Sequence, residues 1–298
     1  MAHVNEYYPH HWYEYGEKYK DWLKLKYEDG ILEIRFHTDD GPMQWCSGPQ
    51  SAIDNICYDI NHDPDVECVI ITGTDDYFMK GNISVDDPRA SAAGWAVDWR
   101  TPWSTYDYWY KYQTLEPINI ANLQCPVIAA INGPQHVHPE LTLCADICLA
   151  ADHAYFTEFH FKNMGVPPGD GTWPIWRELI GHNRARALMY MGGNITAQQL
   201  YDWGVLYEIM PLEKLNDRAW EIARQLMKTP RYGRRMTRTL LNQHWKQLFV
   251  NELESGLAHE GFAGICDAPF WRDDQVKRGC GVIESDEVGG LEFANKND

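Results

Sequence analysis

The chain has no long apolar run and a clear shortage of positive charge. No hydrophobic stretch approaches the roughly 20 residues that a membrane-spanning helix needs. The first residues also lack the basic and apolar regions of a signal peptide. Against 43 aspartates and glutamates stand only 26 lysines and arginines, which gives a net charge of -17. We therefore expect a cytoplasmic protein that binds neither nucleic acid nor a membrane.

Cysteine pairs with metal-ligand spacing are missing as well. The eight cysteines include no CxxC motif, which favours reduced and mostly buried thiols. The N-terminal segment is rich in tyrosine and histidine, but no further ligands follow His10 and His11 at a metal-binding spacing. We expect no metal and no other cofactor.

What the chain does contain is a run of strong structural signals after residue 125. A β-branched and alanine stretch at 126–131 predicts a strand buried on both faces, and an Asn-Gly-Pro turn ends it. Pro139 suits the first position of a helix that closes at Asp146. His138 would then lie at the cap, where free N–H groups attract anionic oxygen.

The same region continues with a second buried strand at 147–151 and an extended segment at 154–161. A Pro-Pro-Gly-Asp-Gly turn at 167–171 starts another helix, with Asp170 at or beside its N-cap. A plain capping role for Asp170 is the alternative to a catalytic one.

Signals on either side of this region are simpler. Segments 23–27 and 31–37 around an Asp-Gly pair predict a β-hairpin, and 66–72 predicts a buried strand. The expected helices lie at 51–60, 183–191, 196–203, 216–228 and 231–264, the last broken near Gly256.

The segments PVIAAING, ICLAAD and NRARALMYMGGNITAQQLYDWGVLYEIMP resemble the crotonase (enoyl-CoA hydratase/isomerase) superfamily over roughly residues 20 to 265. The resemblance implies an α/β fold, with a ββα spiral core followed by a C-terminal helical region that builds trimers or dimers of trimers. The expected divisions are an aromatic arm at 1–19, the core at 20–215, the helical region at 216–266 and a polar tail at 267–298.

Within that superfamily, NGPQHVHPE and PGDG resemble β-diketone hydrolases of the 6-oxocamphor hydrolase type, which work without coenzyme A. The usual hydratase has a glycine run where this chain has His-Val-His-Pro. A glycine run offers backbone N–H groups to a thioester oxygen, whereas Pro139 offers none and His138 brings an imidazole.

This resemblance assigns donors and acids to particular positions. Trp45 and His138 would hold the oxygen of an enolate, and Glu260 would lie near the substrate. Gln50 stands where the pattern has a histidine; it can donate a hydrogen bond but cannot carry a proton near neutral pH. The backbone around Lys80 matches the position of the first oxyanion-binding N–H.

The resemblance also implies a histidine that activates water with Asp170 behind it. Counting back from Asp170 without gaps places that histidine on Phe161, whereas His160 requires compensating shifts around a bulge. Glu158 shares a face with His160 in a regular strand and is the alternative base. If neither reaches the pocket, His138 or Glu260 must transfer the proton.

An aromatic-rich segment at 86–112 lies where the superfamily covers its substrate. Trp95 and Trp99 are four residues apart, so one helical turn could aim both rings at a bulky apolar ligand, or both could pack at a trimer surface.

Three functions follow as hypotheses. The first is hydrolysis of a carbon–carbon bond in a cyclic or bulky β-diketone, a retro-Claisen reaction on a small-molecule substrate. The second is a coenzyme-A-dependent hydratase, isomerase or lyase, and the third is a binding protein that has lost catalysis.

Overall fold

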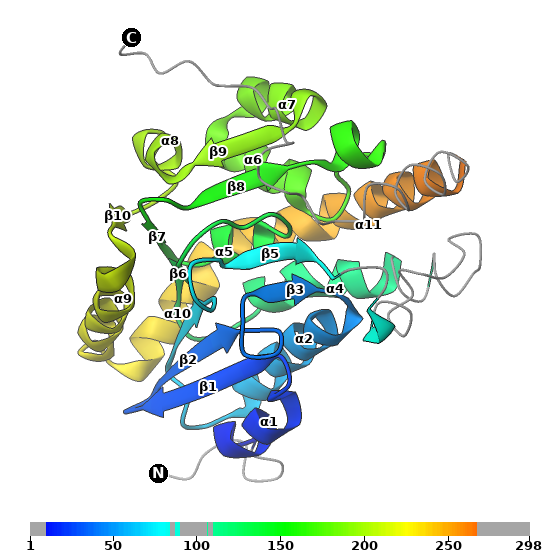
Figure 1. Ribbon diagram of the computed structural model, residues 1–298. Helices are drawn as coiled ribbons and strands as arrows, with labels where there is room; N and C mark the ends of the chain where they lie inside the picture. The colour runs from blue at the N-terminus through cyan, green and yellow to red at the C-terminus, as the bar shows by residue number, and fades with distance from the viewer. Residues whose placement is uncertain (1–9, 84–86, 90–105, 107–109, 267–298) are drawn as a thin grey trace.

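A six-stranded sheet forms the centre of the protein, seen in a computed structural model that describes residues 10–83, 87–89, 106 and 110–266 (Figure 1). Its strand order is β1-β2-β4-β6-β7-β10. The strands are β1 (Leu23–Glu28), β2 (Ile31–Phe36), β4 (Cys68–Thr72), β6 (Val127–Ile131), β7 (Ile147–Ala151) and β10 (Glu208–Met210). Only the β1–β2 hairpin is antiparallel, and the other pairs are parallel, as expected of an α/β protein with crossover connections.

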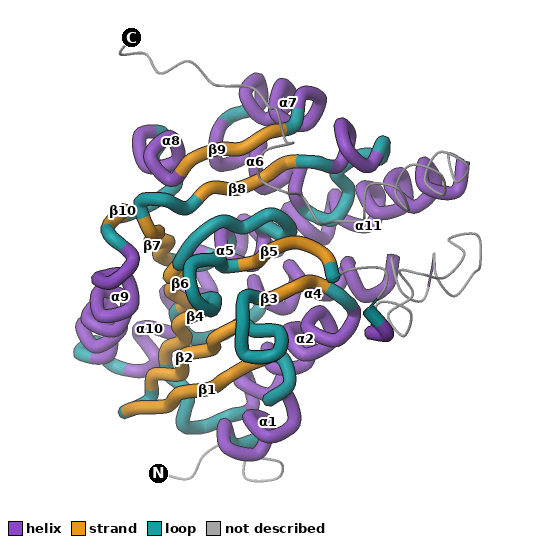
Figure 2. Tube along the Cα trace, in the orientation of Figure 1, coloured by secondary structure: helices purple, strands orange, loops and turns teal. Residues whose placement is uncertain are grey.

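Two short strand pairs form a second layer beside this sheet (Figure 2). Strand β3 (Met43–Trp45) pairs in parallel with β5 (Met79–Asn82), and β8 (Tyr155–Glu158) pairs antiparallel with β9 (Gly193–Thr196). Gln135 forms a bridge to Met79 and another to Phe156, so it joins the two pairs. The segment after β6 is thereby fixed between β5 and β8.

Helices cover both faces of the central sheet. The helices are α1 (Trp12–Tyr19), α2 (Ser47–His62), α4 (Lys111–Ala121), α5 (Glu140–Leu143), α6 (Thr172–Ile180), α7 (His182–Met191), α8 (Ala197–Asp202), α9 (Leu212–Met227), α10 (Arg231–Leu241) and α11 (Gln243–Cys266). Helix α9 buries Ala219 and Trp220 against strand residues such as Ile70, while the larger core fills the opposite face. None of the described helices combines the length and apolar character needed to cross a membrane.

The predicted hairpin and the predicted cap at Thr196 are confirmed. Asp29 and Gly30 have φ values of 49° and 86°, the positive values that a two-residue turn between twisted strands requires. Thr196 caps α8 through a capping box in which its side chain and that of Gln199 each bond the other's backbone N–H.

Two element predictions are wrong in detail. Helix α5 begins at Glu140 with Pro139 as its N-cap and ends at Leu143, so His138 lies just before the cap and Asp146 lies beyond the helix. The long C-terminal helical region breaks at Asn242, between α10 and α11. Gly256 instead lies inside α11, where the lack of a side chain lets the helix approach another segment closely.

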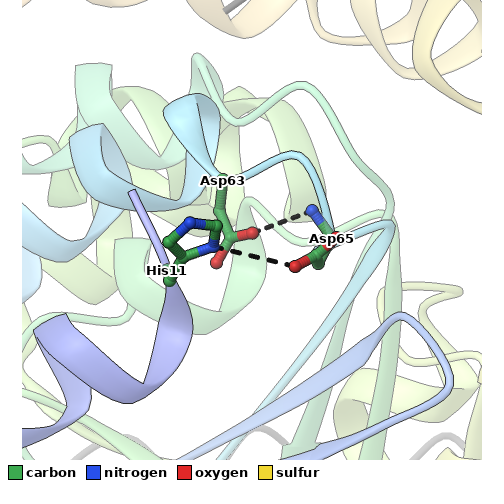
Figure 3. A group of neighbouring side chains, drawn as sticks. All are labelled: His11, Asp63 and Asp65. Atoms are coloured by element: carbon green, nitrogen blue, oxygen red, sulfur yellow. Dashed lines mark hydrogen bonds and ion pairs between the residues drawn. The ribbon is translucent and has the colours of Figure 1, made fainter. Parts of the chain in front are cut away.

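Helix α1 is fastened to the segment after α2 by an acidic group (Figure 3). The Tyr15 hydroxyl donates to Asp63 Oδ2 at 2.9 Å, and the backbone N–H of Asp65 donates to Asp63 Oδ1 at 2.8 Å. His11 Nδ1 lies 3.8 Å from Asp65 Oδ2. Oδ2 of Asp63 therefore accepts the hydrogen bond that holds helix α1, and Oδ1 fixes the local turn at Asp65, which gives this group a structural role.

Candidate active site

Buried histidines, carboxylates and a tryptophan from distant parts of the chain meet beside the second layer of strands. Trp45 ends β3, and His138 lies in the turn before α5. His160 follows β8, and Asp170 precedes α6 by two residues. All four side chains are buried, with Trp45 0% exposed. The two layers of the fold thus bring together residues that the sequence analysis selected separately.

A π-helical turn determines which residue faces Asp170. Strand β8 ends at Glu158, and the chain enters a π-helical turn from His160 to Met164. His160 is 4% exposed and its Nε2 lies 3.2 Å from Asp170 Oδ2. Phe161 is 49% exposed and borders a separate apolar cavity of about 500 Å³. The expectation of an extended segment to residue 161 is therefore wrong, and the turn supplies the shift that brings His160 to Asp170.

His160 has a carboxylate on each ring nitrogen. Its Nδ1 lies 3.0 Å from Glu158 Oε1, and its Nε2 contacts Asp170. Burial lowers the pKa of His160, but the charges of Asp170 and Glu158 outweigh burial and hold that pKa well above its usual value. Burial raises the pKa of Asp170, but the charge and hydrogen bond of His160 prevail and hold it well below its usual range. We call these three residues the Glu158–His160–Asp170 unit.

The backbone of the turn before α5 holds His138 in an unusual conformation. His138 has a φ of 55°, in the left-handed region that residues other than glycine rarely occupy. The side chain of Gln135 donates to the His138 carbonyl at 2.5 Å and accepts from the Thr142 hydroxyl at 2.7 Å. These bonds fix the turn, and with it the direction of the imidazole.

The rings of Trp45 and His138 lie against each other, with centroids 4.1 Å apart and an interplanar angle of 36°. The Trp45 Nε1 donor is buried and has no hydrogen-bond partner among the described residues. A buried donor without a partner costs about 1–3 kcal/mol, so a bound ligand oxygen would relieve that cost. His138 uses Nδ1 for its contacts with described residues, which leaves Nε2 available. The two rings therefore form one potential oxyanion site.

Two glutamates beside His138 were missed by the sequence analysis. Glu140 Oε1 lies 2.5 Å from His138 Nδ1, and Glu116 Oε1 lies 3.8 Å from the same nitrogen. Burial, followed by the charge of Glu140, raises the pKa of Glu116 well above its usual value. Burial also raises the pKa of Glu140, although His138 opposes the shift. Glu140 lies two residues from His138 in the sequence, so this proximity could have identified it. Glu116 lies on α4, far from His138 in the sequence, and no local signal points to it.

The donor atoms of Glu116, His138 and Glu140 lie within 4.8 Å of one another, close enough to test for a divalent cation. The 2.5 Å separation of His138 Nδ1 and Glu140 Oε1 is that of a short hydrogen bond. Two ligands of one ion lie farther apart than this, so a hydrogen bond between His138 and Glu140 fits the distance better.

Glu260 reaches the site from α11. Its Oε2 accepts the backbone N–H of Gly169 at 3.0 Å, immediately before Asp170. Burial, followed by the charge of Asp170, raises the pKa of Glu260 well above its usual value. The structure therefore places Glu260 against the turn that carries Asp170.

The remaining expected site residues are spread more widely. Gln50 is 1% exposed in α2, and neither atom of its amide has a partner among the described residues. Lys80 lies on β5 with its side chain exposed. Trp95 and Trp99 lie outside the described residues.

Comparisons with known proteins identify the family of the chain. A model of the enoyl-CoA hydratase/isomerase family matches residues 53–259. A beta-diketone hydrolase from the cyanobacterium Anabaena sp. PCC 7120, solved with (S)-3-oxocyclohexyl acetic acid, is 35% identical, with a TM-score of 0.77 over 84% of this chain and 96% of that one.

Other relatives act on coenzyme A esters. A 1,2-epoxyphenylacetyl-CoA isomerase from Escherichia coli K12 is 28% identical over 80% of this chain and 88% of its own. An enoyl-CoA hydratase from Bacillus anthracis is 22% identical, with a TM-score of 0.64 over 83% of this chain and 96% of that one, a likeness of fold. On the strength of the family match and the shared fold, the chain belongs to the enoyl-CoA hydratase/isomerase family, the crotonase superfamily.

Proposed function

We propose that this protein is a hydrolase that cleaves a carbon–carbon bond of a cyclic or bulky β-diketone by a retro-Claisen reaction. The observation that carries the proposal is the Trp45–His138 ring pair, whose imidazole lies next to the Glu158–His160–Asp170 unit, with His138 Nδ1 4.0 Å from Asp170 Oδ2. The beta-diketone hydrolase from Anabaena, with its bound cyclic keto acid, supports the same reaction class.

The reaction needs a base for water and donors for the departing enolate. Water gives a proton to the Glu158–His160–Asp170 unit, and the resulting hydroxide adds to one carbonyl carbon. The bond between that carbon and its neighbour breaks, and its electron pair becomes the enolate of the second ketone. Trp45 and His138 donate to the enolate oxygen, and the proton taken from water returns to the enolate carbon to give a keto acid.

The geometry constrains how the base operates. An imidazolium hydrogen-bonded at both ring nitrogens cannot itself accept a proton, and the lowered pKa of Asp170 makes that carboxylate a poor acceptor. The proton from water therefore goes to Glu158. His160 joins the two carboxylates at distances of 3.0 and 3.2 Å, so a proton taken up by one group changes the charge that the other two experience. His160 then positions and balances its two carboxylates, a different role from that of a lone histidine base.

The reaction is tested with a cyclic 1,3-diketone in ¹⁸O-labelled water, with EDTA and without coenzyme A. Mass spectrometry should detect a keto acid that carries one labelled oxygen from the solvent. A lack of product across a series of mono- and bicyclic diketones, or a requirement for coenzyme A, would contradict the proposal.

His138→Ala should lower kcat by about 100-fold or more, because a donor aimed at the developing oxyanion is lost. His244→Ala, which removes an exposed histidine, is the matched control and should retain the original rate. A His138→Ala variant as active as the unmodified protein would remove His138 from the oxyanion site.

The coenzyme A relatives favour a second candidate, an acyl-CoA hydratase or isomerase. It predicts that acyl-CoA binds tightly and is converted, which calorimetry and product analysis would detect. The turn before α5 argues against it, because Pro139 has no N–H to offer a thioester oxygen.

A further inference from the structure

We propose that the neighbouring carboxyl groups of Glu116 and Glu140 retain one proton, and that Glu140 carries it and donates it to Nδ1 of His138. The hydrogen of the neutral imidazole then lies on Nε2. Glu140 is then a positioning residue that keeps His138 a donor toward the oxyanion. The catalytic part of this inference rests on the proposed function, but the position of the proton can be measured without any reaction.

The two glutamates lack the partners that would stabilise two negative charges. Each is 1% exposed, and no lysine or arginine in the described parts of the chain forms an ion pair with either. Glu116 Oε1 and Glu140 Oε2 also have no hydrogen-bond donor among the described residues. An unpaired buried carboxylate is strongly unfavourable, so at least one of the two carboxyl groups holds a proton.

The surroundings make full ionisation still less favourable. Asp170 Oδ2 lies 4.0 Å from His138 Nδ1, and Asp54, Cys57 and Cys144 are further titratable groups near the pair. The positive charge of His160 is already matched by its own two carboxylates. Among the residues that the structure describes, a protonated His138 would then be the one cation paired with Glu116 and Glu140. The raised pKa of Glu116 and that of Glu140 agree with a retained proton.

The position of this proton decides what His138 can do. If Glu140 were ionised beside a neutral imidazole, the ring hydrogen would lie on Nδ1 and Nε2 would be an acceptor. An acceptor facing an enolate oxygen would repel it. If Glu140 carries the proton, it donates across the 2.5 Å contact to Nδ1, and the ring hydrogen moves to Nε2. Only the second arrangement gives a neutral His138 that donates to the oxyanion.

The proton position is tested by ¹⁵N NMR of the full-length protein labelled at histidine, with the His138 signals assigned by their loss in His138→Asn. At pH 7 we expect a neutral ring with hydrogen on Nε2. A neutral ring with hydrogen on Nδ1, or a ring protonated on both nitrogens, would overturn the inference. One equivalent of zinc or manganese in the purified protein, lost in Glu140→Gln, would overturn it as well.

The functional part is tested with two substitutions of Glu140. Glu140→Gln keeps a donor for Nδ1 and should retain the Nε2 hydrogen and activity within about tenfold, whereas Glu140→Leu should lose about 100-fold. Activity of the unmodified protein should fall at alkaline pH as Glu140 loses its proton, and Glu140→Gln should lack this decline. Glu213→Gln, an exposed acid on α9, is the control and should leave the pH profile unchanged.

A Glu140→Gln variant as inactive as Glu140→Leu, or one with the same alkaline decline, would overturn the positioning role. If no diketone is hydrolysed but NMR finds hydrogen on Nε2, the proposed function fails, while the inference that Glu140 carries the proton is supported.

Discussion

Histidines that look alike in the sequence have different surroundings in the fold. His136 and His138 are two residues apart, but His136 Nδ1 contacts the Thr157 hydroxyl at 3.0 Å, and burial lowers the pKa of His136 to about 4. His136 is therefore neutral and structural near pH 7, whereas His138 faces Trp45 and Glu140. The NGPQHVHPE motif identified the segment that carries both histidines. The two imidazoles have different roles because the backbone takes a left-handed turn at His138.

A prediction for a single residue concerns Asp54 and the stability of the fold. It is buried in α2, both carboxylate oxygens lack partners among the described residues, and burial raises its pKa to about 8. Between about pH 4 and pH 8 the folded protein holds a proton that the unfolded chain has lost. Stability due to this group therefore falls as pH rises through that window.

Asp54→Asn should remove this pH dependence. We expect the melting temperature to match that of the unmodified protein near pH 4.5 and to exceed it by several degrees at pH 8, measured by calorimetry. Asp217→Asn, on the exposed face of α9, should show no such difference. An equal shift at both pH values would contradict the assignment.

Contacts between elements decide how the site is assembled. The hairpin, the capped helix α8 and the buried strands of the central sheet could be predicted because their signals are local. The π-helical turn at His160 could not, since its extra residue depends on β8 pairing with β9 and on the position of Asp170. The place of Glu116 in the site could not be predicted either, because it depends on the packing of α4 beside α5.

Helix α11 packs closely against the turn before α6, and substitutions can test this contact directly. A Cβ atom on Gly256 would lie 2.5 Å from the Gly169 carbonyl oxygen, so a side chain cannot fit without moving the helix. Gly256→Ala should therefore lower stability by about 1–3 kcal/mol. It should also reduce activity, because Glu260 would lose its bond to Gly169.

Gly264→Ala in the same helix is the matched control, because a Cβ there meets nothing within 4 Å. It should stabilise the protein by about 0.5–1 kcal/mol through helix propensity. Urea unfolding and turnover of both variants would check the pair. Equal effects of the two substitutions would show that the close crossing has no special role.

At the scale of the whole molecule, the crotonase-type fold was predictable from motifs in chain order, and the expected assembly stays a prediction. Helix α10 exposes Tyr232, Met236 and Leu240, which are four residues apart and so share one face. Apolar rows of this kind mark protein interfaces more often than free surfaces. We expect a trimer or a dimer of trimers, in keeping with the family.

Light scattering should give a mass three or six times 34.5 kDa. The double variant Met236→Asp and Leu240→Asp should dissociate into smaller species if this face forms the interface. A monomer in the unmodified protein would contradict the assembly.

The central claim is that an indole and an imidazole together hold the oxygen of the departing enolate. A crystal structure with a cyclic keto acid product tests it most directly. We predict the ketone oxygen within about 3.2 Å of both Trp45 Nε1 and His138 Nε2, with the new carboxylate beside the Glu158–His160–Asp170 unit. A ketone oxygen bound by backbone N–H groups, away from both rings, would contradict the account.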